Sequence, residues 1–213
     1  RPREHPAHQL GAPLVHARRV SGLAVARLGV RLGGLGPRPH LVGLVLELPA
    51  LLDNPIALVM RALGHGMRIG IIQFVKGKWE TGERDVLDKF PDLVTIRTMG
   101  EGFTWETQDR ARDIAAANAA WDAAKEMIDA SRGDDPKYDL ILLDELNIVL
   151  RYDYIPLDEV VEFLSGKPED LHVIVTGRNA KEPLIEAADL VTEMTMVKHP
   201  FRSGVKAQKG IEF

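Results

Sequence analysis

The chain has 213 residues, which is enough for one folded domain with a substantial apolar core. With 45% hydrophobic and 27% charged residues, it has the composition of a soluble globular protein. A formal net charge of -4 gives no general attraction to polyanions, so a nucleic-acid partner is not expected. The absence of cysteine excludes disulfides and thiolate chemistry, and it agrees with a cytoplasmic location. No apolar stretch reaches the roughly 20 residues of a membrane-spanning helix, so no membrane association is expected.

Residues 1–55 differ in composition from the rest of the chain. They contain no lysine and few acids, and they are rich in Arg, Pro, Gly, Leu, Val and His. A targeting peptide is one interpretation, but the frequent Pro and Gly would break its amphipathic helix. A disordered natural extension is a second, with a short helix at Val15–Leu32. We favour a third: residues 1–55 are an atypical, non-native segment, of the kind produced by a wrong reading frame or too early a start in GC-rich DNA.

From Pro55 onward, strand and helix patterns alternate. Met67–Val75 is a nearly continuous apolar run, typical of a strand covered on both faces of a parallel sheet. A long Ala-rich helix is predicted over Glu106–Arg132, with Ile114, Trp121, Met127 and Ile128 on its buried side. The other predicted strands are Leu93–Thr98, Asp139–Leu143, Leu171–Val175 and Leu190–Met196, and the other helices are Ala57–Leu63, Leu157–Ser165 and Ala180–Ala188.

This alternation predicts an α/β fold over residues 56–213: a mostly parallel sheet with helices on both faces. In such folds, ligands bind at the carboxyl ends of the strands. The sequence therefore directs attention to the residues that follow each predicted strand.

Two acids, Asp144 and Glu145, follow the apolar strand Asp139–Leu143. Carboxylates in this position of a nucleotide-binding α/β protein hold Mg²⁺, because this hard cation prefers oxygen ligands. An equally simple interpretation is that the acids merely solvate the tip of the strand.

Three further segments lie at predicted strand ends. The loop GEGFTWET carries Phe103 and Trp105, which suit a flat apolar partner or packing beneath the loop. Arg178, in Thr-Gly-Arg, and Lys76, directly after Val75, bring cations that would neutralise phosphate or carboxylate groups, or form salt bridges.

Taken together and in order, six blocks of sequence resemble the P-loop type of ATP:corrinoid adenosyltransferases, which act on cob(I)yrinic acid a,c-diamide or cob(I)alamin. The resemblance runs from about Arg61 to Phe213. The blocks are RALGHGMRIGIIQFVKGKWETGE, GFTWET, LILLDELN, YDYIPLDEVVEFL, VIVTGRN and VKHPFRSGVKAQKGIEF.

The resemblance implies a P-loop NTPase fold of the RecA-like type and transfer of the 5′-deoxyadenosyl group of ATP to the Co(I) of a reduced corrinoid. It implies that Glu145 and Asp144 are catalytic and hold Mg²⁺ or Mn²⁺. Phe103, Trp105 and Arg178 would bind the corrinoid, and Arg61, Lys76 and Arg178 the nucleotide. It also implies a homodimer and a reduced flavoprotein as electron donor.

One feature of the family is missing. Its members carry a loop of the form GxGKGK(S/T) before the helix that ends in RALGHG, where backbone N–H groups and lysine cradle phosphates. Here the corresponding residues, Leu44–Ile56, contain neither glycine nor lysine. We therefore expect an adenosyltransferase domain that lacks its phosphate-binding loop. The alternative is a non-catalytic relative that binds corrinoid and has lost ATP binding; a generic P-loop ATPase is a distant third.

Overall fold

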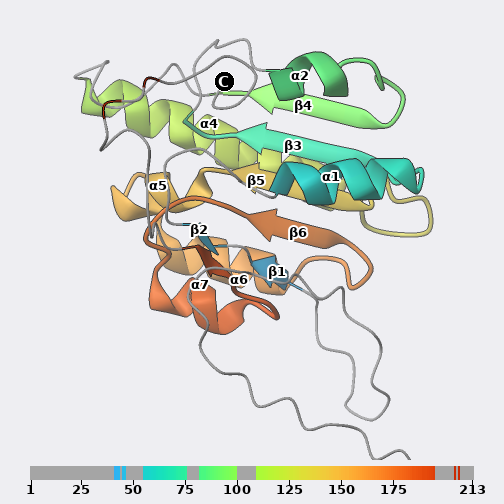
Figure 1. Ribbon diagram of the computed structural model, residues 1–213. Coiled ribbons are helices and arrows are strands. Elements are labelled where there is room, and N and C mark those ends of the chain that lie inside the picture. Colours follow the sequence, from blue (N-terminus) through green and yellow to red (C-terminus); the bar gives the residue numbers. More distant parts are fainter. Residues whose placement is uncertain are drawn as a thin grey trace, which may run out of the picture.

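A computed structural model describes residues 41–43, 45–46, 55–75, 82–99, 109–194, 204 and 206. Its main feature is a five-stranded sheet in the order β1-β6-β5-β3-β4, in which every neighbouring pair is parallel (Figure 1). The strands are β1 Leu41–Gly43, β3 Ile69–Gln73, β4 Val94–Thr98, β5 Leu140–Asp144 and β6 His172–Val175. Two short strands, β2 Val45–Leu46 and β7 Glu193–Met194, form a separate parallel pair.

The helices connect the strands and cover the sheet. They are α1 Pro55–Gly64, α2 Gly82–Leu87, α4 Arg110–Asp129, α5 Leu146–Arg151, α6 Leu157–Ser165 and α7 Glu182–Ala187. The longest, α4, begins where the Asp109 side chain accepts a hydrogen bond from the backbone N–H of Arg112, a typical helix N-cap. In Figure 1, α1 lies on one side of the sheet and α4 on the other.

Strand residues point alternately to two apolar clusters, one on each face. On the α1 face, Ile69 and Ile71 of β3 pack with Val59 of α1. On the opposite face, Ile72 packs with Trp121 and Met127 of α4. The predicted α/β class, with a mostly parallel sheet and helices on both faces, is thus confirmed.

Most predicted elements are present with shifted ends. Met67–Val75 forms a strand only over β3, although Phe74 and Val75 beyond it are buried. Of the predicted buried side of α4, Trp121, Met127 and Ile128 are buried and Ile114 is half-buried. In the predicted strand Leu190–Met196, the described part forms a strand only over β7. Two short helices, α2 and α5, were not predicted.

Within the described part of the chain, no helix has the length and apolar character needed to cross a membrane. The predicted helix Val15–Leu32 lies outside the described residues.

Because all five strands of the sheet run in one direction, their carboxyl ends share one edge, and that edge is built from residues far apart in the sequence.

Candidate functional site at the carboxyl edge of the sheet

A row of polar side chains crosses the carboxyl edge on the α1 face. Thr98 ends β4, Gln73 ends β3 and Asp144 ends β5, and the strand register places Gln73 opposite both Thr98 and Asp144. Thr176 follows β6, whose last residue, Val175, is opposite Leu143. Four strand ends therefore contribute one polar residue each to the same row.

Hydrogen bonds link the members of this polar row. The Thr98 hydroxyl donates to Gln73 Oε1 at 2.9 Å, and Gln73 Nε2 donates to Asp144 Oδ2 at 3.4 Å. From the other side, the Thr176 hydroxyl donates to Asp144 Oδ1 at 3.0 Å. Both carboxylate oxygens of Asp144 thus accept from neighbouring strands, which fixes the plane of the carboxylate.

Glu145 has an unusual backbone conformation. It precedes α5 with φ 66° and ψ 20°, in the left-handed region. This conformation destabilises a residue that has a Cβ by about 1 kcal/mol or more. Its backbone N–H donates to the Thr176 hydroxyl at 2.9 Å. The surrounding structure therefore holds Glu145 in a strained turn directly beside Asp144, and both side chains are half-buried. Strain of this kind is found more often at functional sites than elsewhere.

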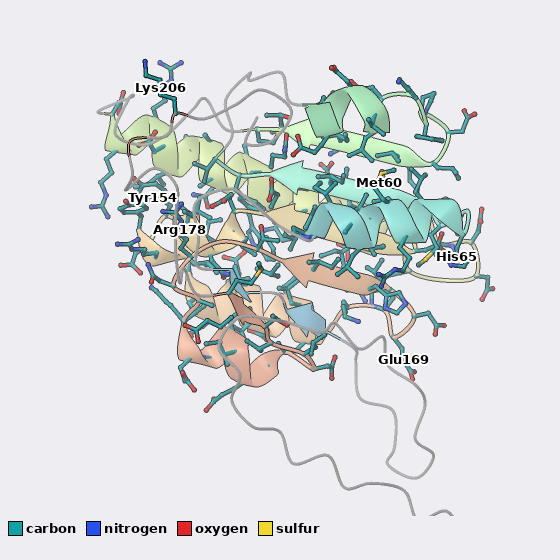
Figure 2. The ribbon with its side chains drawn as sticks, in the orientation of Figure 1. Met60, His65, Tyr154, Glu169, Arg178 and Lys206 are labelled. Carbon is teal, nitrogen blue, oxygen red and sulfur yellow. The ribbon has the colours of Figure 1, made fainter. Side chains whose placement is uncertain are left out.

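The turn after β6 packs tightly against the start of α5. Gly177 has φ 122°, and the Asn147 backbone N–H donates to the carbonyl of Thr176 at 3.1 Å. Arg178 follows on the exposed surface at the same edge of the sheet (Figure 2). The predicted site residues Asp144, Glu145 and Arg178 are therefore brought to one edge.

Arg61 lies elsewhere. It is exposed in the last turn of α1, and the next residue, Ala62, accepts the backbone N–H of Met67 just before β3 begins. This places Arg61 towards the amino ends of the strands. In Figure 2, His65 at the end of the same helix and Arg178 lie at opposite ends of the sheet. The structure does not bring Arg61 to Asp144, and its role at the nucleotide stays a prediction.

A family model described as ATP:corrinoid adenosyltransferase BtuR/CobO/CobP matches residues 54–213. The chain belongs to this family. A corrinoid adenosyltransferase of Sinorhizobium sp. is 57% identical over 158 residues, covering 73% of this chain and 72% of the relative. One of Pseudomonas aeruginosa is 53% identical over 161 residues, covering 76% and 77%. One of Escherichia coli K12 is 46% identical over 153 residues, covering 72% and 74%. The family predicted from the six sequence blocks is confirmed.

Other predicted site residues of this corrinoid adenosyltransferase chain lie outside the described residues. These are Lys76, Phe103 and Trp105. The described residues do show where the chain lies just before the segments that carry them. Val75 is buried directly after β3, and Met99 bonds through its backbone N–H to the Gln73 carbonyl at 3.2 Å. The described chain therefore lies at the carboxyl edge directly before each of these residues' segments.

A nearby ion pair joins two loops of the same edge. Lys181, before α7, donates to Asp153, which follows α5 with a left-handed φ of 54°. The hydrogen bond from Lys181 lowers the pKa of Asp153 below its usual value, so that carboxylate stays ionised. The pair ties the loop after α5 to the segment after Arg178.

In the chain's described portion, no group of three or more His, Cys, Asp or Glu side chains is arranged to hold a metal ion. Two neighbouring carboxylates, Asp144 and Glu145, remain as candidate oxygen donors. Such a sparse donor set suits Mg²⁺, which keeps several waters and is bound through one or two carboxylates together with substrate phosphates. The residues present therefore fit this metal.

Sequence reasoning did not identify Gln73, Thr98 or Thr176. A usable signal was present for Thr98 and Thr176, which end a predicted strand or follow it directly, whereas Gln73 lies inside the predicted strand Met67–Val75. What the sequence does not show is the register, which puts these residues in hydrogen-bonding distance of Asp144.

Proposed function

We propose that this domain serves the ATP-dependent adenosylation of a reduced corrinoid. The Co(I) centre of the substrate attacks the 5′ carbon of ATP, a cobalt–carbon bond forms, and triphosphate leaves. The observation that supports this most strongly is family membership combined with the ordered carboxylate pair Asp144 and Glu145 at the carboxyl edge. Because cobalt itself is the nucleophile, the protein needs no nucleophilic side chain, which agrees with the absence of cysteine.

In this proposal, Asp144 and Glu145 are the catalytic residues, and their carboxylates would hold Mg²⁺ or Mn²⁺. When bound, the metal neutralises charge that builds up on the leaving triphosphate. The hydrogen bonds from Gln73 and Thr176 hold the Asp144 carboxylate in one orientation before any substrate arrives. Such preorganisation removes the cost of reordering the site during the reaction.

The remaining predicted residues have supporting roles. Phe103 and Trp105 present apolar surface to the corrinoid and exclude water from the strongly reducing metal centre. Arg178, exposed at the carboxyl edge, neutralises charge on corrinoid or nucleotide, and Lys76 is assigned the same task at the nucleotide. Arg61 is assigned to the nucleotide as well, although its place on α1 requires the nucleotide to extend along that helix.

The phosphate side of the site is incomplete. Residues Leu44–Ile56 carry no glycine or lysine, and α1 begins at Pro55, which has no backbone N–H to offer a phosphate. We therefore propose that the chain as written makes little adenosylcorrinoid. The same observation supports the second candidate, a non-catalytic relative that still binds corrinoid.

A chimera tests the proposed function. The residues before Asn54 are replaced by the corresponding segment of the Sinorhizobium sp. relative, and adenosylcorrinoid formation from ATP and reduced corrinoid is followed by absorbance. We expect an active chimera, with Asp144→Asn reducing its rate about 100-fold or more. A chimera that folds and binds corrinoid, yet makes no adenosylcorrinoid, would favour the binding-only relative.

The origin of residues 1–55 has its own test. We propose that the DNA upstream of the Arg61 codon encodes the GxGKGK(S/T) loop in another reading frame. Sequencing and translating that DNA in all three frames decides the matter. If no frame contains the loop, the segment is a natural divergence and the second candidate function gains support.

Finer features of the proposal follow the family resemblance. We propose a homodimer, a reduced flavoprotein as electron donor and a cytoplasmic location. Size-exclusion chromatography with light scattering tests the dimer, and the dependence of the rate on a reduced flavoprotein tests the donor.

A further inference from the structure

We propose that Thr176 is a positioning residue for both carboxylates of the site. Its hydroxyl sets the orientation of Asp144 and the backbone conformation of Glu145 at the same time, so that the pair is ready to bind a divalent cation. This inference rests on the proposed function, because it assumes that the two acids act as a metal-binding pair.

The geometry around the Thr176 hydroxyl is well defined. It donates to Asp144 Oδ1 at 3.0 Å and accepts the backbone N–H of Glu145 at 2.9 Å. A hydroxyl has one hydrogen to donate and two lone pairs that accept, so these two bonds are compatible. Thr176 is only 3% exposed, so water competes poorly for either bond.

The position of Thr176 is in turn fixed by the sheet. Its backbone N–H donates to the Leu143 carbonyl at 3.1 Å, and its carbonyl accepts from the Asn147 backbone N–H at 3.1 Å. The first of these bonds continues the β5–β6 ladder by one residue past the end of β6, and the second ties Thr176 to the first turn of α5. Thr176 therefore has a fixed position, and its hydroxyl restrains the less regular backbone at Glu145.

The left-handed conformation of Glu145 needs such support. A residue with a Cβ leaves this region readily unless its surroundings hold it there. The Glu145 side chain makes no capping hydrogen bond at the start of α5. The bond from its N–H to Thr176 is thus a specific restraint on the turn. Losing the hydroxyl releases this turn and one side of the Asp144 carboxylate together.

Gln73 is the second restraint on Asp144 and provides a graded comparison. Its amide donates to Asp144 Oδ2, but the bond is longer, at 3.4 Å. Unlike Thr176, Gln73 is not seen to hydrogen-bond the Glu145 backbone. Removing it affects one of the two acids through a longer bond. The effect of Gln73→Met should accordingly be smaller than that of Thr176→Val.

The test measures Mn²⁺ binding to the full chain by the electron paramagnetic resonance signal of the free ion, with Mn²⁺ alone as the probe. The variants are Thr176→Val, which keeps the shape and removes the hydroxyl, and Thr176→Ser, which keeps the hydroxyl. Thr176→Ala, which removes the hydroxyl together with a methyl group, decides the matter if Thr176→Val does not fold. Urea unfolding of each variant reports on the fold.

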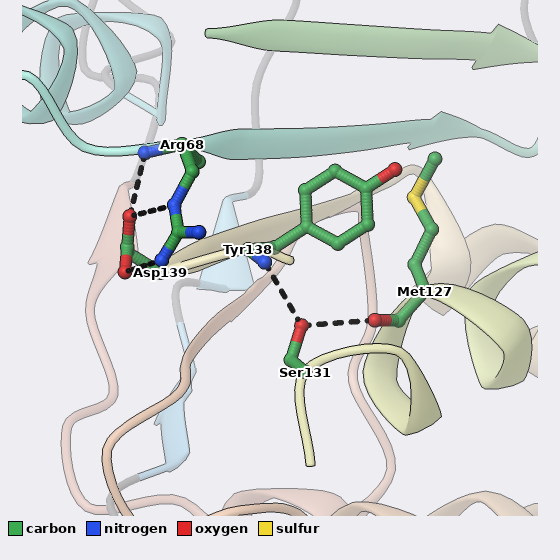
Figure 3. Close-up of polar contacts among 5 residues, drawn as sticks. All are labelled: Arg68, Met127, Ser131, Tyr138 and Asp139. Atoms are coloured by element: carbon green, nitrogen blue, oxygen red, sulfur yellow. Dashed lines mark hydrogen bonds and ion pairs between the residues drawn. The ribbon is translucent and has the colours of Figure 1, made fainter. Parts of the chain in front are cut away.

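Ser131 offers a matched control. It is also 3% exposed, donates to the Met127 carbonyl at 3.0 Å and accepts the Tyr138 backbone N–H at 3.2 Å, at the amino end of β5 (Figure 3). Ser131→Ala therefore removes an equivalent pair of hydrogen bonds far from the carboxyl edge. It should reduce stability without changing Mn²⁺ affinity.

We expect Thr176→Val to weaken Mn²⁺ binding about tenfold or more, as loss of a partner that orients a metal ligand usually does, and Thr176→Ser to restore most of it. Wild-type affinity in Thr176→Val or, if that variant does not fold, in Thr176→Ala overturns the inference. Asp144→Asn tests the proposed metal site separately from the role of Thr176. If Asp144→Asn weakens binding and the hydroxyl-free variant does not, only the role of Thr176 fails. If Asp144→Asn has no effect, the proposed metal site fails and the inference falls with it.

Discussion

Gly177 lies directly against Asn147, so that a Cβ atom at position 177 would come within 2.9 Å of the Asn147 Cβ and 3.2 Å of its backbone N. Gly177 also has φ 122°, a conformation that residues with a Cβ rarely adopt. This contact sets the approach of the turn after β6 to the first turn of α5, and with it the distance from Thr176 to Glu145.

We predict that Gly177→Ala lowers the free energy of unfolding by about 1–3 kcal/mol, because both the backbone strain and the contact must be relieved. Urea denaturation measures this. Gly133→Ala is the control, since Gly133 also has a left-handed φ of 83° but has no atom within 4 Å of an added Cβ. If both variants lose the same stability, the close contact with Asn147 contributes nothing.

Glu145 allows its backbone strain to be separated from its carboxylate. Glu145→Gly and Glu145→Ala both remove the carboxylate, but only glycine adopts the left-handed conformation without cost. We predict that Glu145→Gly is more stable than Glu145→Ala by about 1 kcal/mol, while both lose Mn²⁺ affinity. Equal stabilities in urea denaturation would show that position 145 is not strained.

Arg68 and Asp139 form a two-point ion pair at the amino ends of β3 and β5 (Figure 3). The hydrogen bond from Arg68 is the main reason that the pKa of Asp139 lies below its usual value. A carboxylate with a lowered folded-state pKa adds stability above its unfolded pKa, and this is lost as the pH falls through the folded value.

The stability lost in Asp139→Asn should therefore be larger at pH 7 than at pH 3. Urea midpoints at the two pH values measure it. In an Arg68→Met background the pH dependence of the Asp139→Asn effect should largely disappear. A loss that is independent of pH with Arg68 present would contradict the assignment of the lowered pKa to this pair.

Phe103 and Trp105 are predicted to contact the corrinoid. Phe103→Ala or Trp105→Ala should weaken the binding of reduced corrinoid about tenfold, through loss of aromatic contact area. Anaerobic titration followed by absorbance measures the affinity. Phe90→Ala is the control, because Phe90 is 40% exposed and precedes the amino end of β4. Equal corrinoid affinities in all three variants would show that the loop carrying Phe103 and Trp105 does not contact the corrinoid.

The sequence predicts the parts of this fold whose signal is local. The apolar run Ile69–Val75 and the Ala-rich α4 are recognisable because their side chains are buried in regular patterns. Helix α5 was missed because six residues directly after a strand, without Gly or Pro between them, show no helical periodicity. Helix α2 is equally short and has one buried residue, Leu87.

The candidate site is likewise predicted only in part from the sequence. The sequence predicts Asp144, Glu145 and Arg178 as site residues because each ends or follows a strongly apolar strand. Their partners Gln73 and Thr176 depend on strand order, which brings residues 71 and 32 positions from Asp144 into hydrogen-bonding distance. Pairing over such separations is set by the packing of the whole sheet, so a single sequence does not reveal it.

We propose that this corrinoid adenosyltransferase domain lacks its phosphate-binding loop. The most direct test is the rate at which the chain as written converts ATP and reduced corrinoid to adenosylcorrinoid, measured beside the Sinorhizobium sp. relative. We predict a rate lower by about 100-fold or more, because the charge of the triphosphate is left without its backbone and lysine donors. A rate equal to that of the relative, with residues 1–55 unchanged, would show that ATP is used without such a loop.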